Sequence, residues 1–318
     1  MVWLYILIFI ISCLVLIRSG VWVVKSLTKI AQFLKWKEFI VASVLIAFST
    51  SFPEIFIGIT SALHQKPELS FGNIIGSNII VLTLVITIGV ILAGGLKFKG
   101  KILQKSSVYA GIYGLFPLLL MLDGRVSRVD GIVLLLALSF YFDQLLSEEE
   151  RFTKIFSNHF KEDWPYFKLF LKNLAMFWIG SGLLLISAEG VVFSAMKLAA
   201  SLNLPLVIIG TIFVALGTSL PEIAFGIRSI TMGHKEMILG NVMGSVIINS
   251  TLVLGLTALI SPFDVSDFSP YLRGIIFTVA TCLFFVIFAR TDRRITKREA
   301  IFLLGIYIFF VATEIFLK

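Results

Sequence analysis

The stretch "ALGTSLPEIAFG", residues 215–226, places two hydroxyls, a proline and a carboxylate inside a long apolar run. A closely similar stretch, "AFSTSFPEIFIG", occupies residues 47–58. An ionisable side chain is costly to bury in an apolar environment, and such residues inside membranes usually serve a function. We therefore predict that the matching carboxylates, Glu54 and Glu222, are functional residues.

The similarity extends beyond these two stretches and indicates an internal repeat. Residues 40–85 align with residues 208–253 at a constant offset of 168, without a gap, and 20 of the 46 pairs are identical. A chance alignment of two apolar helices would match Leu, Ile and Val, whereas many of these matches fall on polar or conformationally special residues. They include Ala47/Ala215, Thr50/Thr218, Ser51/Ser219, Pro53/Pro221, Glu54/Glu222, Gly58/Gly226, Gly72/Gly240, Asn73/Asn241, Gly76/Gly244 and Ser77/Ser245.

The composition is that of an integral membrane protein. Of the 318 residues, 58% are hydrophobic and 14% are charged, against about 25% charged in soluble domains. Runs such as "GIVLLLALSFYF" do not alternate in polarity, which favours helices over a transmembrane barrel. We read Met1–Ile17 as part of a retained first helix. The fold class is predicted to be all-α, with transmembrane helices near 1–24, 38–63, 69–96, 105–122, 130–147, 168–196, 204–231, 236–260, 271–290 and 299–317.

Ten helices in two copies leave five per copy, an odd number, so the second copy must cross the membrane in the opposite sense. The chain is therefore predicted to form two inverted five-helix repeats, residues 1–147 and 168–318, joined by a cytoplasmic linker at 148–167. Inverted repeats are common in secondary transporters, where broken helices of the two halves build one site near the membrane midplane.

The basic residues predict the orientation. Lys and Arg collect in cytoplasmic loops of membrane proteins. With an outside N-terminus, 20 of them fall on the cytoplasmic side and six on the outer side, with Arg18 inside the first span. We therefore expect a multi-pass protein of the cytoplasmic membrane with both termini outside. The net charge of +8 then reflects topology within a lipid bilayer, and nucleic acid is not an expected partner.

The paired motif predicts a cation site. Pro53 and Pro221 should kink or unwind their helices and expose backbone carbonyls. Together with the hydroxyls and carboxylates of Thr50, Ser51, Glu54, Thr218, Ser219 and Glu222, these carbonyls would form an all-oxygen shell that suits Ca²⁺ or Na⁺. Ser77 and Ser245 are expected to join it. For Asn73 and Asn241, a role in the site and a role in helix packing both stay open.

These residues resemble a known family. "STSFPE" with "GNIIGSN", and "GTSLPE" with "GNVMGS", look like the two α-repeats of the Ca²⁺/cation antiporter superfamily, especially its prokaryotic sodium/calcium exchangers. The resemblance implies ten helices, export of Ca²⁺ against entry of Na⁺ or H⁺, and first and sixth helices that slide across the bundle. It also implies the following ligands, with Ala47 and Ala215 contributing carbonyls: Ala47, Thr50, Ser51, Glu54, Ser77, Ala215, Thr218, Ser219, Glu222 and Ser245.

The sequence departs from the family pattern one turn beyond Ser77 and Ser245. The family has an amide or a carboxylate in the third helix and usually an aspartate in the eighth, where this chain has Val81 and Asn249. Asn249 could supply an uncharged oxygen, and we include it in the predicted metal site. Na⁺ is the preferred coupling ion, and H⁺ coupling or exchange of another cation is the alternative.

The sequence predicts an antiporter without a cofactor, and two other classes of function fit it less well. An intramembrane hydrolase would need catalytic groups, and the chain has no HExxH motif. An ion channel would differ by passing continuous currents. Arg18 and Glu189 are expected at the membrane interface, and His64 is expected to be solvated.

Overall fold

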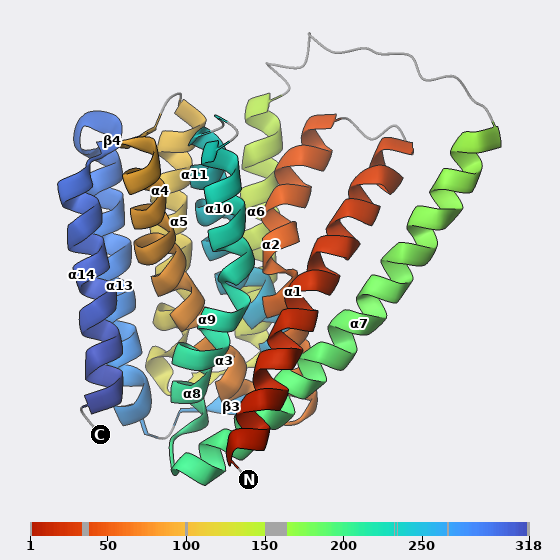
Figure 1. The fold of residues 1–318 in the computed structure, drawn as a ribbon. Helices are drawn as coiled ribbons and strands as arrows, with labels where there is room; N and C mark the ends of the chain where they lie inside the picture. Colours follow the sequence, from red (N-terminus) through yellow and green to blue (C-terminus); the bar gives the residue numbers. More distant parts are fainter. Residues whose placement is uncertain are drawn as a thin grey trace.

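The computed structural model describes residues 2–33, 38–98, 101–149, 164–231, 233, 235–265 and 267–316. Within them the protein is helical apart from four strands of two residues each, which confirms the predicted all-α class (Figure 1). The helices of the first half are α1 (Val2–Phe33), α2 (Glu38–Leu63), α3 (Pro67–Ile80), α4 (Ile86–Ala93), α5 (Lys101–Leu120) and α6 (Arg128–Glu149). Those of the second half are α7 (Trp164–Leu202), α8 (Leu206–Ile209), α9 (Ala215–Thr218), α10 (Leu220–Thr231), α11 (Lys235–Ile248), α12 (Leu254–Ile260), α13 (Ser269–Arg290) and α14 (Lys297–Phe316).

Eight helical segments in the described part are long and apolar enough to cross a membrane. Each coincides with one of the spans predicted from the sequence. The two remaining predicted spans, 38–63 and 130–147, coincide with α2 and α6. The eight segments are Val2–Val23, Pro67–Ala93, Leu103–Asp123, Leu169–Leu202, Leu206–Thr231, Lys235–Ile260, Ser269–Arg293 and Lys297–Phe316.

Three spans contain a π-helical segment that the sequence analysis did not foresee. These segments are η1 (Val81–Val85), η3 (Gly210–Val214) and η4 (Asn249–Val253). Each holds a threonine, Thr83, Thr211 or Thr251, whose hydroxyl donates to the carbonyl four residues earlier. Such back-bonding competes with the helix ladder and deforms it, and π segments often occur at functional sites.

The two prolines stand in different settings, and only Pro221 lies beside an interruption of its helix. Pro221 is the second residue of α10, and the break lies at Ser219, between α9 and α10. Proline is tolerated there because the first turn of a helix needs no amide donors. Helix α2 instead continues through Pro53, which packs near Gly20 of α1. A proline removes one ladder bond, and the remaining bonds and neighbouring helices can preserve a membrane helix.

Short antiparallel strand pairs join the halves at opposite ends of the bundle. Strand β1 (Leu96–Lys97) pairs with β4 (Arg294–Ile295), and β2 (Arg125–Val126) pairs with β3 (Phe263–Asp264). The free ends of α1 and α14 lie together at the end that carries β3, away from β4 (Figure 1). Both termini therefore lie at one end of the molecule, as the topology prediction requires.

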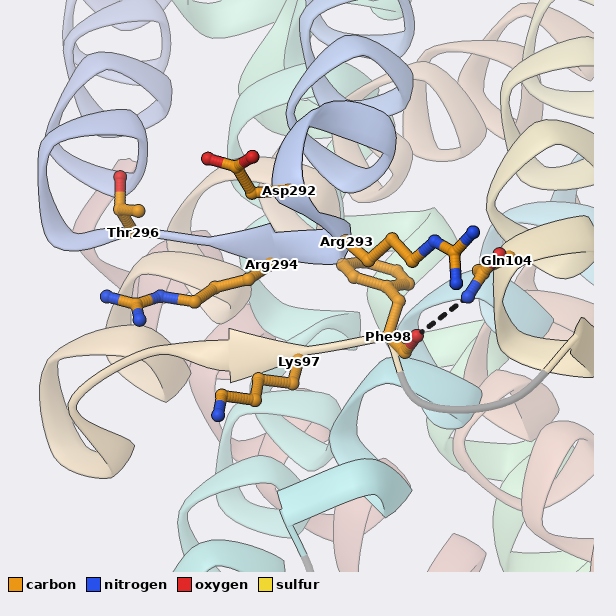
Figure 2. Close-up of a pocket in the computed structure, with 7 residues that line it drawn as sticks. All are labelled: Lys97, Phe98, Gln104, Asp292, Arg293, Arg294 and Thr296. Carbon is orange, nitrogen blue, oxygen red and sulfur yellow. Dashed lines mark hydrogen bonds between the residues drawn. The ribbon is translucent and has the colours of Figure 1, made fainter.

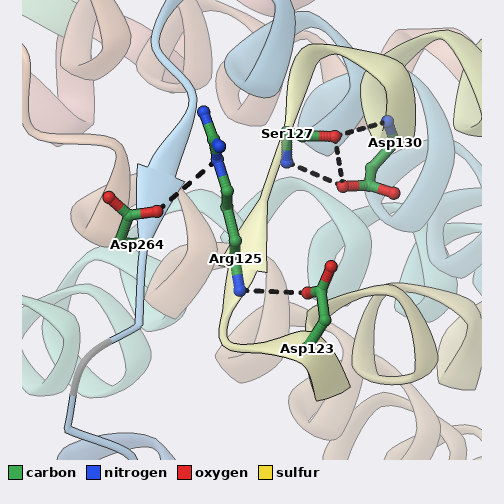
Figure 3. A network of polar contacts seen from close by, with 5 residues as sticks. All are labelled: Asp123, Arg125, Ser127, Asp130 and Asp264. Carbon is green, nitrogen blue, oxygen red and sulfur yellow. Dashed lines mark hydrogen bonds and ion pairs between the residues drawn. The ribbon is translucent and has the colours of Figure 1, made fainter.

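Polar contacts accompany both strand pairs. At the β2–β3 end, Arg125 Nε lies 3.5 Å from Asp264 Oδ1, and Ser127 and Asp130 form a capping box that starts α6 (Figure 3). Thr296 and Glu299 form the corresponding box at the start of α14. A capping box satisfies the free amides at a helix start. The same device thus begins the last helix of each half.

The β1–β4 end is strongly basic. A cavity of about 720 Å³ is lined by Lys97, Phe98, Gln104, Asp292, Arg293, Arg294 and Thr296 (Figure 2). Gln104 Nε2 donates to the Phe98 carbonyl at 3.2 Å, and the Phe98 amide donates to the Arg293 carbonyl at 2.8 Å. This cluster belongs to the side that the charge distribution predicts to be cytoplasmic.

Close helix contacts hold the centre together. A Cβ added at Gly72 would lie 2.2 Å from the Val207 carbonyl oxygen, and one at Gly76 would lie 2.0 Å from that of Thr211. Helix α3 therefore touches the backbone of α8 and η3 directly, as small residues allow in membrane helices. Helices α1 and α7 pack on each other at one flank, inclined to the rest (Figure 1).

Candidate cation site

The predicted site residues lie in α2, α3, α9, α10 and α11, at Ser219 between α9 and α10, and at the start of η4, and hydrogen bonds bring several of them together. Nearly all are completely buried, and the most exposed, Thr50, is 5% exposed. Ala47 lies in α2, but its surroundings fall outside the described residues. The buried set comprises Thr50, Ser51, Glu54, Ser77, Ala215, Thr218, Ser219, Glu222, Ser245 and Asn249.

One arm of the network links Glu54 to the second half of the chain. Thr218 Oγ1 donates to Asn73 Oδ1 at 3.0 Å and lies 3.2 Å from Ser77 Oγ. Ser77 Oγ in turn donates to Glu54 Oε1 at 3.4 Å. Ser219 Oγ also reaches Ser77, at 3.3 Å.

The other arm repeats the same contacts with the halves exchanged. Thr50 Oγ1 donates to Asn241 Oδ1 at 2.9 Å and lies 3.1 Å from Ser245 Oγ. Each threonine thus contacts an asparagine and a serine of the other half. Thr50 contacts Asn241 and Ser245, and Thr218 contacts their repeat equivalents, Asn73 and Ser77. The Glu222 carboxylate faces Thr50 and Ser245 and lies within electrostatic range of Glu54.

Several buried polar atoms at this site have no hydrogen-bond partner. They include both carboxylate oxygens of Glu222, Glu54 Oε2, Ser51 Oγ and both side-chain polar atoms of Asn249. An unpaired buried polar group costs about 1–3 kcal/mol, and more when it is charged. The side-chain nitrogens of Asn73, Asn241 and Asn249 are also unpaired. A bound cation would be a partner for the oxygens, and water would be a partner for both kinds of atom. Ser51 and Asn249 are completely buried, and neither side chain joins the hydrogen-bond network described above.

Asn73 and Asn241, for which two roles were left open, are direct partners of the site threonines. Their identity at the common offset was the signal for this role, but a sequence alone does not show which helices face each other. Asn78 behaves differently: its Nδ2 donates to Ser250 Oγ at 2.8 Å, a contact without a counterpart in the other half.

Two peripheral residues expected to be solvated or interfacial form a pair. His64 Nε2 lies 2.7 Å from Glu189 Oε1, with side chains 39% and 54% exposed. This contact joins the end of α2 to α7, and His64 stays partly exposed beside it, as expected. Arg18 is exposed on α1. His159 and His234 lie outside the described residues.

The donor set has the character of a hard-cation site. Within the described ranges, no group of three or more His, Cys, Asp or Glu side chains is placed to hold a metal ion. Two carboxylates with hydroxyl and amide oxygens offer the ligands that Ca²⁺ and Na⁺ favour, and soft or nitrogen ligands for zinc or copper do not take part.

The sequence pattern of the sodium/calcium exchanger protein family matches residues 4–142 and 172–316, most of both halves. The chain belongs to the sodium/calcium exchanger family. This confirms the resemblance seen in the doubled motif. The family is one of sodium/calcium exchangers, so its general activity is the transport of cations across membranes.

Named relatives of this exchanger-family chain agree. It is 27% identical to the sodium/calcium exchanger MaX1 of Methanosarcina acetivorans, over 96% of this chain and 97% of that protein. It is 29% identical to the inner membrane protein YrbG of Escherichia coli K12, over 71% of this chain and 70% of that protein. The family is thus one of membrane proteins that include exchangers.

A solved structure shares the fold. The sodium-calcium exchanger NCX_Mj, soaked with 10 mM Na⁺ and 10 mM Sr²⁺, superposes with a TM-score of 0.66 and 27% sequence identity. The match covers 98% of this chain and 99% of that one. The similarity in fold therefore spans both halves of the chain.

Proposed function

We propose that this protein is a secondary active antiporter that exchanges Ca²⁺ for Na⁺ at a site between Glu54 and Glu222. The observation that carries the proposal is the buried, symmetric network in which each half supplies one carboxylate and its threonine, while several oxygens stay unpaired. A cation would give these oxygens the partner that they lack. Membership of the exchanger family supports the same activity.

The proposed architecture is ten transmembrane helices in two inverted repeats, 1–147 and 168–318, with 148–167 as a cytoplasmic linker. Three findings support it. The π segments η1 and η4 are related by the repeat offset of 168, the strand pairs join the halves at opposite ends, and both terminal helices end on one side. The basic β1–β4 end would face the cytoplasm, so both termini would be outside the cytoplasmic membrane.

The proposed ligands are all oxygens. Side chains and the two alanine carbonyls would alternate around the ions, and Asn249 would add an uncharged oxygen. The full set is Ala47, Thr50, Ser51, Glu54, Ser77, Ala215, Thr218, Ser219, Glu222, Ser245 and Asn249.

Exchange would follow from competition at the two carboxylates. Two negative charges neutralise one Ca²⁺ or two Na⁺, so the two kinds of ion exclude each other, and each occupied form can return to the other side. Alternating access would come from sliding of α1 and α7, which pack together at the flank, along the central helices. Because Ca²⁺ and Na⁺ cross in opposite directions at the same site, the movement of one ion is coupled to the movement of the other.

Two positions of the site bear on which ion is exchanged for Ca²⁺. Val81 is completely buried at the start of η1 and cannot coordinate a cation, while Asn249 at the start of η4 carries no charge. This observation keeps H⁺ coupling, or exchange of another cation, as the alternative. Na⁺ remains the preferred partner because the other motif positions carry the residues that the exchanger resemblance implies as ligands.

Uptake of ⁴⁵Ca²⁺ into proteoliposomes tests the function. We expect uptake when an outward Na⁺ gradient is imposed and none in the Glu222→Gln variant. Uptake driven by a pH gradient alone would replace Na⁺ by H⁺ in the proposal. Absence of uptake under both gradients would contradict Ca²⁺ transport.

A further inference from the structure

The two strand pairs occupy equivalent places in the two halves but carry different charges. Strands β1 and β3 follow α4 and α12, and strands β2 and β4 precede α6 and α14, the last helix of each half. In the β2–β3 pair, Arg125 stands directly opposite Asp264, and the two form an ion pair (Figure 3). In the β1–β4 pair, Lys97 stands directly opposite Arg294. Two cations thus take the places that a cation and an acid hold at the other end.

The Lys97–Arg294 pair disfavours the contact between its strands. The Cβ atoms of residues directly opposite each other in an antiparallel pair are about 4.5–5.5 Å apart, and like charges placed there are destabilising. Both side chains are exposed, and neither forms an ion pair with an acid in the described part of the chain. An anion bound between the two side chains would replace their repulsion by attraction, as Asp264 does for Arg125.

The two cations border a cavity whose walls are rich in positive charge. Lys97, Arg293 and Arg294 line the cavity of about 720 Å³ at this end. A second cavity, of about 560 Å³, shares Arg293 with the first and is also lined by Lys105 and Arg290. The two cavities therefore lie side by side and place five basic side chains around one region of the surface.

The acids of this region do not neutralise the Lys97–Arg294 pair. Asp292 lines the first cavity, and Figure 2 shows its carboxylate directed away from the Lys97 amine. Glu299 accepts hydrogen bonds from the amide and the hydroxyl of Thr296, both at 2.7 Å, in the capping box of α14. The cavity therefore presents a net positive charge to a ligand.

The backbone holds Arg293 at the cavity in a conformation that side chains rarely adopt. Its φ angle is 51°, and that of Asp292 is 53°. The residue directly before the equivalent strand β2 is Gly124, with a φ of 81°. Glycine adopts positive φ angles without the steric cost that a Cβ brings. An arginine is thus an unfavourable choice for the turn alone, and Figure 2 shows its side chain extending to Gln104, at the wall that the two cavities share.

The cavity also lies at the edge of the apolar surface of α13 and α14. Ile287, one turn before Arg290 on α13, is exposed, as are Ile301 and Phe302 in the second turn of α14. Both helices are long and apolar enough to cross a membrane, so these side chains are suited to contact lipid. The charge distribution predicts that this end faces the cytoplasm. Basic pockets between helices on that side of a membrane bind the headgroups of anionic lipids.

We propose that the cavity binds the phosphate of an anionic phospholipid from the cytoplasmic leaflet, with Lys97 and Arg294 on either side of the phosphate and Arg293 at its edge. The apolar chains of the lipid follow the exposed face of α13 and α14. Since β1 belongs to the first half and β4 to the second, the phosphate joins the halves at this end, as the Arg125–Asp264 ion pair does at the other. The inference depends on the orientation of the chain in the membrane and is independent of the transported cation.

Lipid binding to the purified protein in detergent, without Ca²⁺, tests this site. The probe is dioleoyl phosphatidylglycerol, and native mass spectrometry measures its affinity. Dioleoyl phosphatidylcholine serves as the matched lipid without net charge, and inorganic phosphate serves as the soluble anion. Lys97→Asp gives this strand pair the cation and acid of the other pair. Arg125→Gln is the control, because it removes the cation at the position equivalent to Arg294.

We expect phosphatidylglycerol to bind the unsubstituted protein about tenfold more tightly than phosphatidylcholine. Lys97→Asp should weaken phosphatidylglycerol binding by about tenfold or more, because it removes a cation and adds an acid beside the phosphate. Arg125→Gln should bind the lipid as the unsubstituted protein does. In lipid-free detergent, Lys97→Asp should unfold at the same or a higher temperature, since an ion pair replaces a pair of like charges.

Equal affinity of the unsubstituted and Lys97→Asp proteins for phosphatidylglycerol, or an equal loss in Arg125→Gln, would overturn the proposal. Displacement of the lipid by inorganic phosphate at the same concentration would assign the cavity to a soluble anion and would also overturn it. If Lys97→Asp does not fold, Lys97→Gln takes its place, with an expected loss of about threefold or more. Because the readout needs no transport, a failure here is distinct from a failure of Ca²⁺ uptake.

Discussion

Glu54 and Glu222 are buried carboxylates whose nearest polar neighbours are hydroxyls and amides, and no Lys or Arg of the described chain is bonded to them. A cation should therefore bind the folded protein through both, and binding to the folded form alone raises its stability by about 2.7 kcal/mol at a hundredfold excess over Kd. We predict that Ca²⁺ raises the Tm of the detergent-solubilised protein and that Glu54→Gln or Glu222→Gln abolishes the rise. Glu189→Gln, at an exposed carboxylate, should retain it. An undiminished rise in both site variants would place the cation elsewhere.

Val81 occupies a position where exchangers usually have a ligand. Val81→Asn would bring an amide oxygen to the start of η1, opposite in the repeat to Asn249. We predict that this variant shows a steeper dependence of Ca²⁺ uptake on Na⁺ concentration, measured in proteoliposomes. A Val81→Leu control should show no such gain. An unchanged Na⁺ dependence in Val81→Asn would remove this position from the coupling mechanism.

At this scale, the repeat made the site largely predictable. Identity at a fixed offset selected Thr50, Thr218 and both glutamates, and the structure brings them together. The pairing of Thr50 with Asn241 was beyond reach, because the partners are 191 residues apart and no local pattern encodes which helices face each other. The His64–Glu189 contact was missed for the same reason.

Among the elements, α3 needs small residues where it crosses α8 and η3. A methyl group at Gly72 would collide with the backbone of Val207, which cannot move without shifting α8 and η3. Overpacking of this kind costs about 1–3 kcal/mol. We predict that Gly72→Ala lowers the thermal stability and reduces Ca²⁺ uptake. Gly305→Ala, on an exposed face of α14 with nothing within 4 Å of the added methyl group, should be neutral or stabilising. Equal stability of the two variants would contradict the packing account.

The positions of the helices could be predicted from the lengths of the apolar runs. The π segments and the interruption at Ser219 could not be predicted in this way. Each predicted span falls on a helix, because length and hydropathy alone decide crossing. The π segments each hold a threonine bonded to the carbonyl four residues back, but Ser187 and Ser194 make the same bond within the regular helix α7, so this pattern does not predict a π segment. Proline gave a mixed result, since Pro221 stands beside a break at Ser219 and Pro53 lies inside a continuous helix.

For the whole molecule, the charge of the site sets the electrical character of exchange. The network holds two carboxylates, which balance one Ca²⁺ against two Na⁺, so one cycle would move no net charge. We predict that a membrane potential, set by a K⁺ gradient with valinomycin, leaves the initial rate of Na⁺-driven Ca²⁺ uptake unchanged. Asn249→Asp would add a third charge and make the rate depend on the potential. A potential-dependent rate in the unsubstituted protein would show that more charge moves than the two carboxylates balance.

The central claim is that the two halves of the chain each give one carboxylate to a single cation. The most direct measurement is an anomalous difference map from crystals soaked in Sr²⁺, which takes the same oxygen ligands as Ca²⁺. The account predicts one peak between Glu54 and Glu222, at about 2.3–2.6 Å from oxygens of both, which is absent from crystals of Glu222→Gln. A peak bound by one half alone, or no peak at this place in crystals that bind Sr²⁺ elsewhere, would contradict it.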